Sequence, residues 1–184
     1  MKKVARPITA KYLQNAATFY LERYPSTAEG LRRVLNRRVR KAEMLNAPVM
    51  ENVQQAISGI VQKFVDAGMI DDKAFAQTKA RALHRRGTSS KLTRQKLHHA
   101  GVDRETLDRA MEGLDEELHL DPRQRELKAA IALARRRKLG PFRAEKERKD
   151  RRAKDLAAMA RGGFDYQLAK KVIDAPDADS LDEE

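Results

Sequence analysis

The chain has no cysteine and no tryptophan, and aromatic residues make up only 5% of its 184 positions. The lack of cysteine excludes disulfides and thiolate metal sites and favours a reducing compartment. No apolar run approaches the roughly 20 residues that a membrane-spanning helix needs. The start of the chain, through Pro7, has too few apolar residues for a secretion signal. We therefore expect a cytoplasmic protein that has no membrane partner, no metal and no cofactor.

Acidic residues are scarce relative to basic ones, and the net charge of +12 is distributed unevenly. Residues 1–50 carry 11 Lys/Arg and 3 Asp/Glu, residues 71–120 carry 10 and 9, and residues 121–163 carry 15 and 6. Residues 174–184 contain six acids and no base. Two basic regions with a nearly neutral middle predict a polyanion or an acidic protein surface as the partner.

The segment from Phe64 to Ala76 predicts one helix ending and another beginning. Gly68 can adopt the left-handed conformation that ends a helix without a Cβ penalty. Asp71 or Asp72 can then accept hydrogen bonds from the free amides of the next helix. Upstream, apolar residues keep the spacing of a buried helical face, namely Val53, Ala56, Ile57, Ile60, Val61, Phe64 and Val65.

Similar patterns along the chain predict an all-α fold of three tandem three-helix repeats. Ser26 with Glu29 has the spacing of a capping box, Asn46-Ala-Pro48 predicts a break, and Asp121-Pro122 predicts another helix start. We expect three-helix units at residues 8–70, 71–120 and 121–174, followed by a disordered acidic tail at residues 175–184.

An internal repeat with an offset of 62 residues supports this division. Leu35 corresponds to Leu97 and then to Met159, and Leu21 corresponds to Leu83. Gly101-Val102-Asp103 corresponds to Gly163-Phe164-Asp165 at the same offset. Repeated units that are too small to bury a core alone are expected to stack on their neighbours.

Signals for catalysis are weak. No two of the histidines, His84, His98, His99 and His119, have the i, i+4 spacing that would place a zinc ligand pair on one helix face. The Asp71-Asp72 pair fits a helix cap better than acid–base chemistry. A helix-turn-helix interpretation of residues 96–111 places several acids on the helix that would have to enter DNA, which disfavours base readout. We therefore expect no catalytic residues and no enzyme.

Taken in order, several motifs resemble the RecX family, the regulators of the RecA recombinase. They are the joint Phe64-Val-Asp-Ala-Gly-Met-Ile-Asp-Asp-Lys-Ala-Phe-Ala76, then Arg81-Ala-Leu-His-Arg-Arg-Gly87, Gln95-Lys-Leu-His-His-Ala-Gly-Val-Asp103, Ala132-Leu-Ala-Arg-Arg-Arg-Lys-Leu-Gly-Pro-Phe-Arg143 and Met159-Ala-Arg-Gly-Gly-Phe-Asp165. The resemblance covers about residues 10–174. Thr93 departs from it, because the family often has an aliphatic residue there.

The resemblance implies an elongated, curved helical protein that lies in the groove of the RecA–single-stranded DNA filament and inhibits ATP turnover and strand exchange. It also implies a binding protein, which we expect to be a monomer. Backbone contacts to single- or double-stranded DNA are a second partner class, and a general nucleic-acid-binding protein independent of RecA is the alternative function. Charge and placement predict the filament-binding residues to be Arg32, Arg33, Arg37, Arg38, Arg85, Arg86, Arg94, Lys96, Arg135, Arg136, Arg137 and Lys138.

Overall fold

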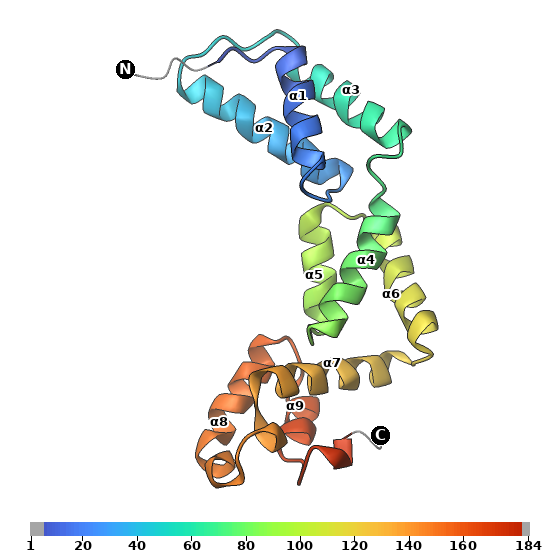
Figure 1. Cartoon of the computed structure of the whole chain (residues 1–184), viewed down its shortest axis with the longest axis vertical. Coiled ribbons are helices and arrows are strands. Elements are labelled where there is room, and N and C mark those ends of the chain that lie inside the picture. Colours follow the sequence, from blue (N-terminus) through green and yellow to red (C-terminus); the bar gives the residue numbers. More distant parts are fainter. Residues whose placement is uncertain (1–5, 182–184) are drawn as a thin grey trace. The chain divides into compact units, whose positions relative to one another are not determined.

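The computed structural model describes residues 6–181, and within this range the chain forms helices joined by turns and loops. Among the described residues the one β-type pairing is an isolated parallel bridge between Ile8 and Val49. The expected all-α fold of helical repeats is confirmed. The elements, labelled as in Figure 1, are α1 (Ala10–Leu21), α2 (Ala28–Met44), α3 (Val53–Asp66), α4 (Asp72–Arg85), α5 (Ser90–Ala100), α6 (Arg104–Leu118), α7 (Pro122–Arg137), the 3₁₀ turn η1 (Gly140–Phe142), α8 (Glu145–Arg161), α9 (Tyr166–Ile173) and the 3₁₀ turn η2 (Asp179–Leu181).

The described helices pack into two compact units. The first unit runs through Phe75 and also includes His99–Thr106, and the second comprises Ala76–His98 together with the chain from Leu107 onward. Helices α1–α3, α4–α6 and α7–α9 fall in turn within the three ranges that the sequence predicts for three-helix units. That finer division into three stays a prediction.

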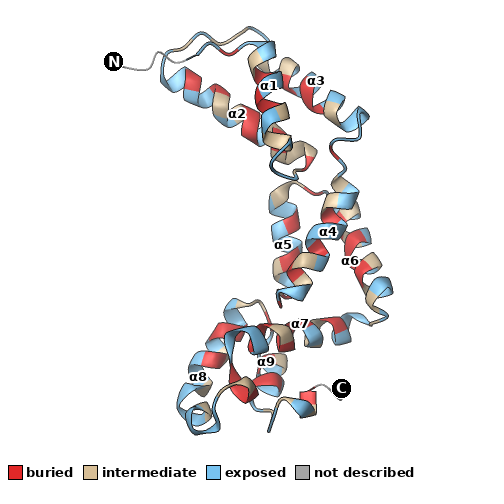
Figure 2. Ribbon diagram, viewed as in Figure 1, coloured by how far each residue is buried: buried red, intermediate tan, exposed pale blue. Residues whose placement is uncertain are grey.

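The core of the first unit is built from aliphatic side chains of α1, α2 and α3. Leu13, Leu31, Leu35 and Ile57 are all fully buried, as Figure 2 shows for their helices. On α3, the predicted inward face is largely correct, but Val65 at its end is 36% exposed. Since each large buried side chain contributes about 1.5–3 kcal/mol, this cluster is the main source of the unit's stability.

The connection between α2 and α3 is held against the start of the chain. The amide of Ile8 donates to the Pro48 carbonyl at 2.9 Å, and the amide of Met50 donates to the Ile8 carbonyl at 3.1 Å. The break predicted at Asn46-Ala-Pro48 is present, because α2 ends at Met44. Ile8 is only 3% exposed, so this loop is part of the packed unit.

The N-terminus of α2 corrects one detail of the sequence analysis. Its cap is Thr27, whose hydroxyl accepts a hydrogen bond from the Gly30 amide at 2.9 Å, and not Ser26. Thr27 is 1% exposed, so the cap is buried. Glu29, the expected partner in a capping box, instead pairs with arginines on α2 itself.

The second unit is centred on α7, α8 and α9, whose buried residues, red in Figure 2, form one hydrophobic cluster. Helix α7 contributes the small side chains Ala129, Ala130 and Ala134, which allow neighbouring helices to approach closely. Met159 of α8 and Val172 of α9 are fully buried against it. The cap of α7 is a capping box of Asp121 with Gln124, and Pro122 is at the first helical position, as predicted.

An ion pair between the buried Asp155 and the half-buried Arg143 orders the turn that follows α7. Asp155 of α8 is 2% exposed and accepts hydrogen bonds from the Gly140 amide at 2.9 Å and from Arg143 Nη2 at 3.0 Å. Because a buried carboxylate needs partners for its charge, Asp155 connects η1 to α8. Nothing in the sequence spacing singled out this pair.

The 62-residue repeat is visible in three dimensions. Leu35, Leu97 and Met159 are all 0% exposed. Gly101 and Gly163 both have positive φ, of 94° and 86°, which L side chains rarely adopt. The aspartates that follow them cap helices in the same way, with Asp103 accepting from the Thr106 amide at 2.9 Å and Asp165 from the Leu168 amide at 2.8 Å.

Gly101 and Gly163 each lie where one helix start packs closely against another part of the chain. We call these two equivalent contacts joints. In the first unit, the Thr27 hydroxyl donates a short hydrogen bond to the carbonyl of Ala100, and a Cβ on Gly101 would lie 2.5 Å from the Glu29 Cβ. In the second unit, a Cβ on Gly163 would lie 2.3 Å from the Ser89 hydroxyl. Thr27 and Ser89 are themselves 62 residues apart, so a buried hydroxyl at a helix start packs against a glycine at both joints.

An acid from a neighbouring helix completes each joint. Asp72 Oδ1 at the start of α4 accepts from the Ala28 amide at 2.9 Å, and Glu126 Oε2 of α7 accepts from the Ser90 amide at 2.9 Å. Ala28 and Ser90 are the first residues of α2 and α5 and are again 62 residues apart. Each acid therefore satisfies a free amide at a helix N-terminus.

The end of the described chain differs from the sequence expectation. Residues 175–181, for which disorder is predicted, include η2, and its Leu181 is 4% exposed and packs in the core of the second unit. The Ser180 amide donates to Asp177 Oδ1 at 2.8 Å, which stabilises this turn. Residues 182–184 of the predicted tail lie outside the described residues.

Candidate partner-binding surface

Four of the predicted binding residues lie on α2 in the first unit. Arg32 and Arg33 pair with Glu29 at 2.9 and 3.0 Å, and Arg33 also donates to the His99 carbonyl at 2.6 Å. The hydrogen bond from Arg32, together with Arg33, lowers the pKa of Glu29, which keeps this carboxylate ionised. Arg32 and Arg33 are thus partly used within the protein, and their charge is partly neutralised.

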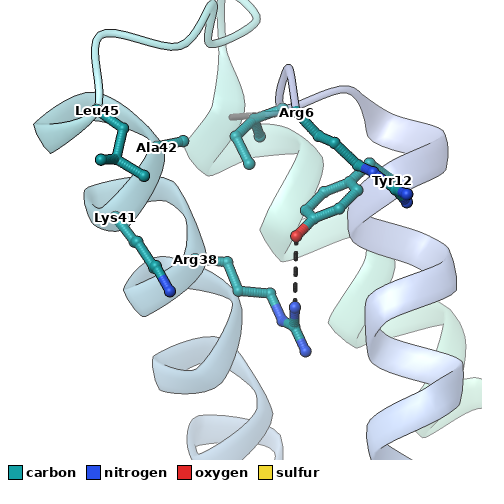
Figure 3. A pocket seen from close by; sticks show the side chains of 7 residues that line it. Arg6, Tyr12, Arg38, Lys41, Ala42 and Leu45 are labelled. Carbon is teal, nitrogen blue, oxygen red and sulfur yellow. Dashed lines mark hydrogen bonds between the residues drawn. The ribbon is translucent and has the colours of Figure 1, made fainter. Parts of the chain in front are cut away.

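Arg38 lines a small pocket of about 220 Å³ in the first unit (Figure 3). Its Nη1 donates to the Tyr12 hydroxyl at 3.3 Å. Arg6 and Lys41 also line this pocket, while Ile8, Ala42 and Leu45 provide an apolar wall. Arg6 and Lys41 were not among the predicted residues, because only their approach in the fold reveals them.

Arg37 lines a different and larger pocket of about 620 Å³ in the first unit. Arg33 and Arg40 of α2 line it as well, together with Tyr20 and with His99 at the end of α5. Arg40 was missed as a site residue, although its i, i+3 spacing from Arg37 places both on one helix face. The structure therefore divides the basic stretch of α2 between two pockets.

In the second unit, Arg85 and Arg86 are exposed at the end of α4. The next residue, Gly87, lies directly against α7, since a Cβ there would be 2.3 Å from the Leu133 amide nitrogen. This contact brings the end of α4 close to the part of α7 that precedes Arg135. Arg94 and Lys96 of α5 are also exposed, but Arg94 forms a short ion pair with Asp108 of α6.

The four basic residues at the end of α7 are all exposed. Arg135 lies over the Phe142 ring, with its guanidinium carbon 5.3 Å from the ring centroid. Lys138 has φ 54°, so the helix ends in a left-handed residue that is not glycine. Positive charge at a helix C-terminus is favourable, which gives a structural reason for this run beside its expected role in binding.

As a set, ten of the twelve predicted residues are exposed, and Arg32 and Arg38 are half-buried. Seven of them form no ion pair or side-chain hydrogen bond with other described residues, so their charges face solvent. These seven are Arg37, Arg85, Arg86, Lys96, Arg136, Arg137 and Lys138.

No group of three or more His, Cys, Asp or Glu side chains within residues 6–181 has an arrangement that could hold a metal ion. Burial lowers the pKa of His84, aided by the nearby Arg125, so its imidazole is neutral at pH 7. None of the described helices is long and apolar enough to cross a membrane.

A buried arginine is the main polar feature that the sequence analysis missed. Arg125 of α7 is 6% exposed, forms a short ion pair with Asp115, and donates to the Ser90 hydroxyl at 3.2 Å. It lies next to Glu126, so the joint between α5 and α7 contains charges of both signs. Thr93, the expected departure from the family pattern, is 2% exposed and occupies an inward position of α5.

Comparison with known proteins places this chain in a family. The family model described as the second three-helix domain of RecX matches residues 71–111. The chain is similar to the regulatory protein RecX of Myxococcus xanthus, with 37% identity over 174 residues that cover 94% of this chain and 90% of the relative. It is 28% identical over 162 residues to the regulatory protein RecX of Agrobacterium fabrum, covering 88% and 82%.

Two solved structures share the fold. The crystal structure of RecX from Lactobacillus salivarius matches with a TM-score of 0.57 and 20% identity, over 95% of this chain and 97% of that one. A second crystal structure of a regulatory protein RecX matches with a TM-score of 0.55 and 18% identity, over 90% and 72%. Since the Myxococcus relative is 37% identical over nearly all of both chains, this chain belongs to the RecX family of regulatory proteins.

Proposed function

We propose that this protein binds in the groove of the RecA–single-stranded DNA filament and inhibits RecA ATP hydrolysis and strand exchange. It would act as a binding protein without catalytic residues of its own. Membership of a family of regulatory proteins supports a regulatory role. RecA as the target comes from the resemblance noted in the sequence.

The observation that carries the proposal is the set of seven exposed cations that form no ion pair or side-chain hydrogen bond with other described residues. A cation already held in an ion pair must give up that pair to bind a partner, whereas these seven need not. Such charges steer an anionic partner and increase the association rate. The filament offers both nucleic-acid phosphates and a protein surface for them to contact.

The test is single-strand-dependent ATP hydrolysis by RecA in the presence of sub-stoichiometric amounts of this protein. We expect hydrolysis to fall, and the double reversal Arg136→Glu with Arg137→Glu to relieve the inhibition. The matched control is Lys149→Glu with Arg151→Glu, two exposed positions of α8 outside the predicted set, which changes the net charge equally. Circular dichroism verifies that both variants are folded.

The alternative is a general nucleic-acid-binding protein that does not need RecA. In that case RecA would hydrolyse ATP at its normal rate with this protein present, while naked DNA would still be bound. Equal relief of inhibition by the α8 control would mean that overall charge, and not the end of α7, decides binding.

A further inference from the structure

The pocket of about 620 Å³ in the first unit has a lining whose residue types suit ligand binding. It lies along one face of α2 and includes the end of α5 and one side chain of α1. Its lining combines an aromatic ring, arginines and small residues. The lining residues are Tyr20, Glu29, Gly30, Arg33, Val34, Asn36, Arg37, Arg40, His99 and Ala100.

The charge of this pocket is positive and partly uncompensated. Glu29 is the one acid among the described residues of the lining, and Arg32 and Arg33 pair with it at 2.9 and 3.0 Å. Arg37 and Arg40 are exposed and have no ion pair with any described residue. Their spacing of three residues directs both guanidinium groups to the same side of α2. The pocket thus presents two free guanidinium groups to an anion.

The pocket is lined by the ring of Tyr20, in a chain that has only five Phe, four Tyr and no Trp. The ring of Tyr20 in the lining lies beside the ring of Tyr24, with centroids 5.3 Å apart. Tyr24 is 56% exposed, and Phe19, which precedes Tyr20 in the sequence, is 55% exposed. Arg23 lies over the Phe19 ring at 3.6 Å, so the face of one exposed ring already has a planar partner.

We propose that this pocket binds single-stranded nucleic acid, with phosphates on Arg37 and Arg40 and an unpaired base on the Tyr24 ring. Stacking on aromatic rings beside a basic groove is the usual way to bind single strands without reading sequence. In a duplex the faces of the bases are covered by their neighbours, so the ring contributes only with a single strand. An acidic peptide would use the arginines but gain little from the tyrosine.

This proposal adds a direct nucleic-acid contact to the proposed function, and it is tested without RecA. The full chain is titrated into a fluorescently labelled deoxythymidylate 20-mer, and separately into a mixed-sequence duplex of 20 base pairs, with anisotropy as the readout. Tighter binding of the single strand is expected. Equal affinity for both would overturn the proposal, and RecA inhibition could still stand in that case.

The tyrosine is tested by Tyr24→Ala, which should weaken single-strand binding by about tenfold and leave duplex binding within about twofold. Tyr24→Phe keeps the ring and should bind the single strand like the original chain. The matched control is Tyr166→Ala, which removes another exposed tyrosine, one that is 64% exposed on α9. A loss of affinity in the control as large as that of Tyr24→Ala would overturn the assignment.

The arginines are tested through salt dependence. Arg37→Ala and Arg40→Ala should each reduce the slope of log K against log salt by about 0.7 for a single strand, because one phosphate contact is lost. Arg161→Ala, an exposed arginine of α8, is the control and should leave the slope unchanged. Unchanged slopes for Arg37 and Arg40, or displacement of the strand by a polyglutamate peptide at equal charge concentration, would overturn the proposal.

Discussion

Asp72 at the start of α4 accepts a hydrogen bond from the backbone amide of Ala28, the first residue of α2, at 2.9 Å. The two residues are 44 positions apart, and the bond joins α4 to the N-terminus of α2 within the first unit. The neighbouring Asp71 has a different task, because its Oδ1 accepts from the Ala74 amide at 2.9 Å and caps α4 itself. Of these two neighbouring aspartates, Asp71 therefore caps its own helix, whereas Asp72 makes a long-range contact.

Replacing Asp72 by alanine should lower the free energy of unfolding by about 1–3 kcal/mol, because the partly buried Ala28 amide loses its acceptor. Asp72→Asn keeps an acceptor oxygen and should cost less. Urea denaturation followed by circular dichroism measures both. Asp71→Ala is the comparison, and it should cost about 0.5–2 kcal/mol as the loss of an exposed cap. If the free energy of unfolding of Asp72→Ala equals that of the original chain, this hydrogen bond does not stabilise the fold.

Asp72 and Glu29 should respond to acid in opposite directions. Burial raises the pKa of Asp72 above its usual 3.8, so the folded state binds its proton more readily than the unfolded state. Its ionised form is therefore unfavourable to folding at neutral pH, and that cost disappears as pH falls below 3.8. Arg32 lowers the pKa of Glu29 below its usual 4.5, so its stabilising contribution is present above 4.5 and is lost as pH falls through the folded value.

The measurement compares the original chain with Asp72→Asn and Glu29→Gln by urea denaturation between pH 3 and pH 7. Lowering the pH should improve the stability of the original chain relative to Asp72→Asn and reduce it relative to Glu29→Gln. Parallel pH curves for all three proteins would mean that neither carboxyl group changes its pKa on folding.

Glycine-to-alanine substitutions should destabilise the protein more at the joints, at Gly101 and Gly163, than at glycines elsewhere. Gly101→Ala and Gly163→Ala combine positive φ with a Cβ that would overlap a neighbouring side chain, so each should destabilise by more than 1 kcal/mol. Gly68→Ala also has positive φ, of 69°, but no atom within 4 Å of a Cβ, so it should cost only the backbone strain.

Gly59→Ala in the middle of α3 is the matched control, because its Cβ would meet nothing within 4 Å and its φ is helical. It should stabilise the protein by about 0.4–1 kcal/mol. Thermal denaturation gives the order of the four variants. Loss of stability in Gly59→Ala equal to that in Gly101→Ala would contradict the importance of the joints.

Leu97→Ala should lower the free energy of unfolding by about 2–5 kcal/mol, because the side chain is 0% exposed and its removal leaves a cavity. Leu45→Ala removes the same atoms from a position that is 56% exposed and should cost little. Calorimetry and denaturant unfolding provide the comparison. A broader unfolding transition for Leu97→Ala would also indicate that packing between repeated helices maintains cooperativity. Equal melting temperatures for both variants would refute the predicted role of Leu97 in the core.

Sequence patterns predicted the helices, their ends and the repeat well because those features depend on local chemistry. Gly68 adopts the left-handed conformation predicted for the end of α3, and Asp71 caps α4. The buried Leu35, Leu97 and Met159 follow from apolar periodicity together with the 62-residue offset.

Contacts between distant residues could not be predicted in the same way. The prediction that Ser26 caps α2 was wrong. Ser26 and Thr27 both carry a hydroxyl group next to the start of this helix, and only the approach of Ala100 selects Thr27. One available signal was overlooked: the offset that relates Gly101 to Gly163 also relates Thr27 to Ser89. The pockets along α2, including Arg40 and Tyr20, depend on how α1 and α5 pack against it.

The two joints share a design but differ in side-chain length. Asp72 and Thr27 serve one joint, and Glu126 and Ser89 serve the other, so one joint has the shorter acid with the bulkier hydroxyl residue and the other has the reverse. Both acids reach the amide of the first residue of a helix at 2.9 Å, although they come from positions that are not equivalent in the repeat. The two joints therefore use the same kinds of contact, but the additional methylene group lies on the acid in one and the additional methyl group on the hydroxyl residue in the other.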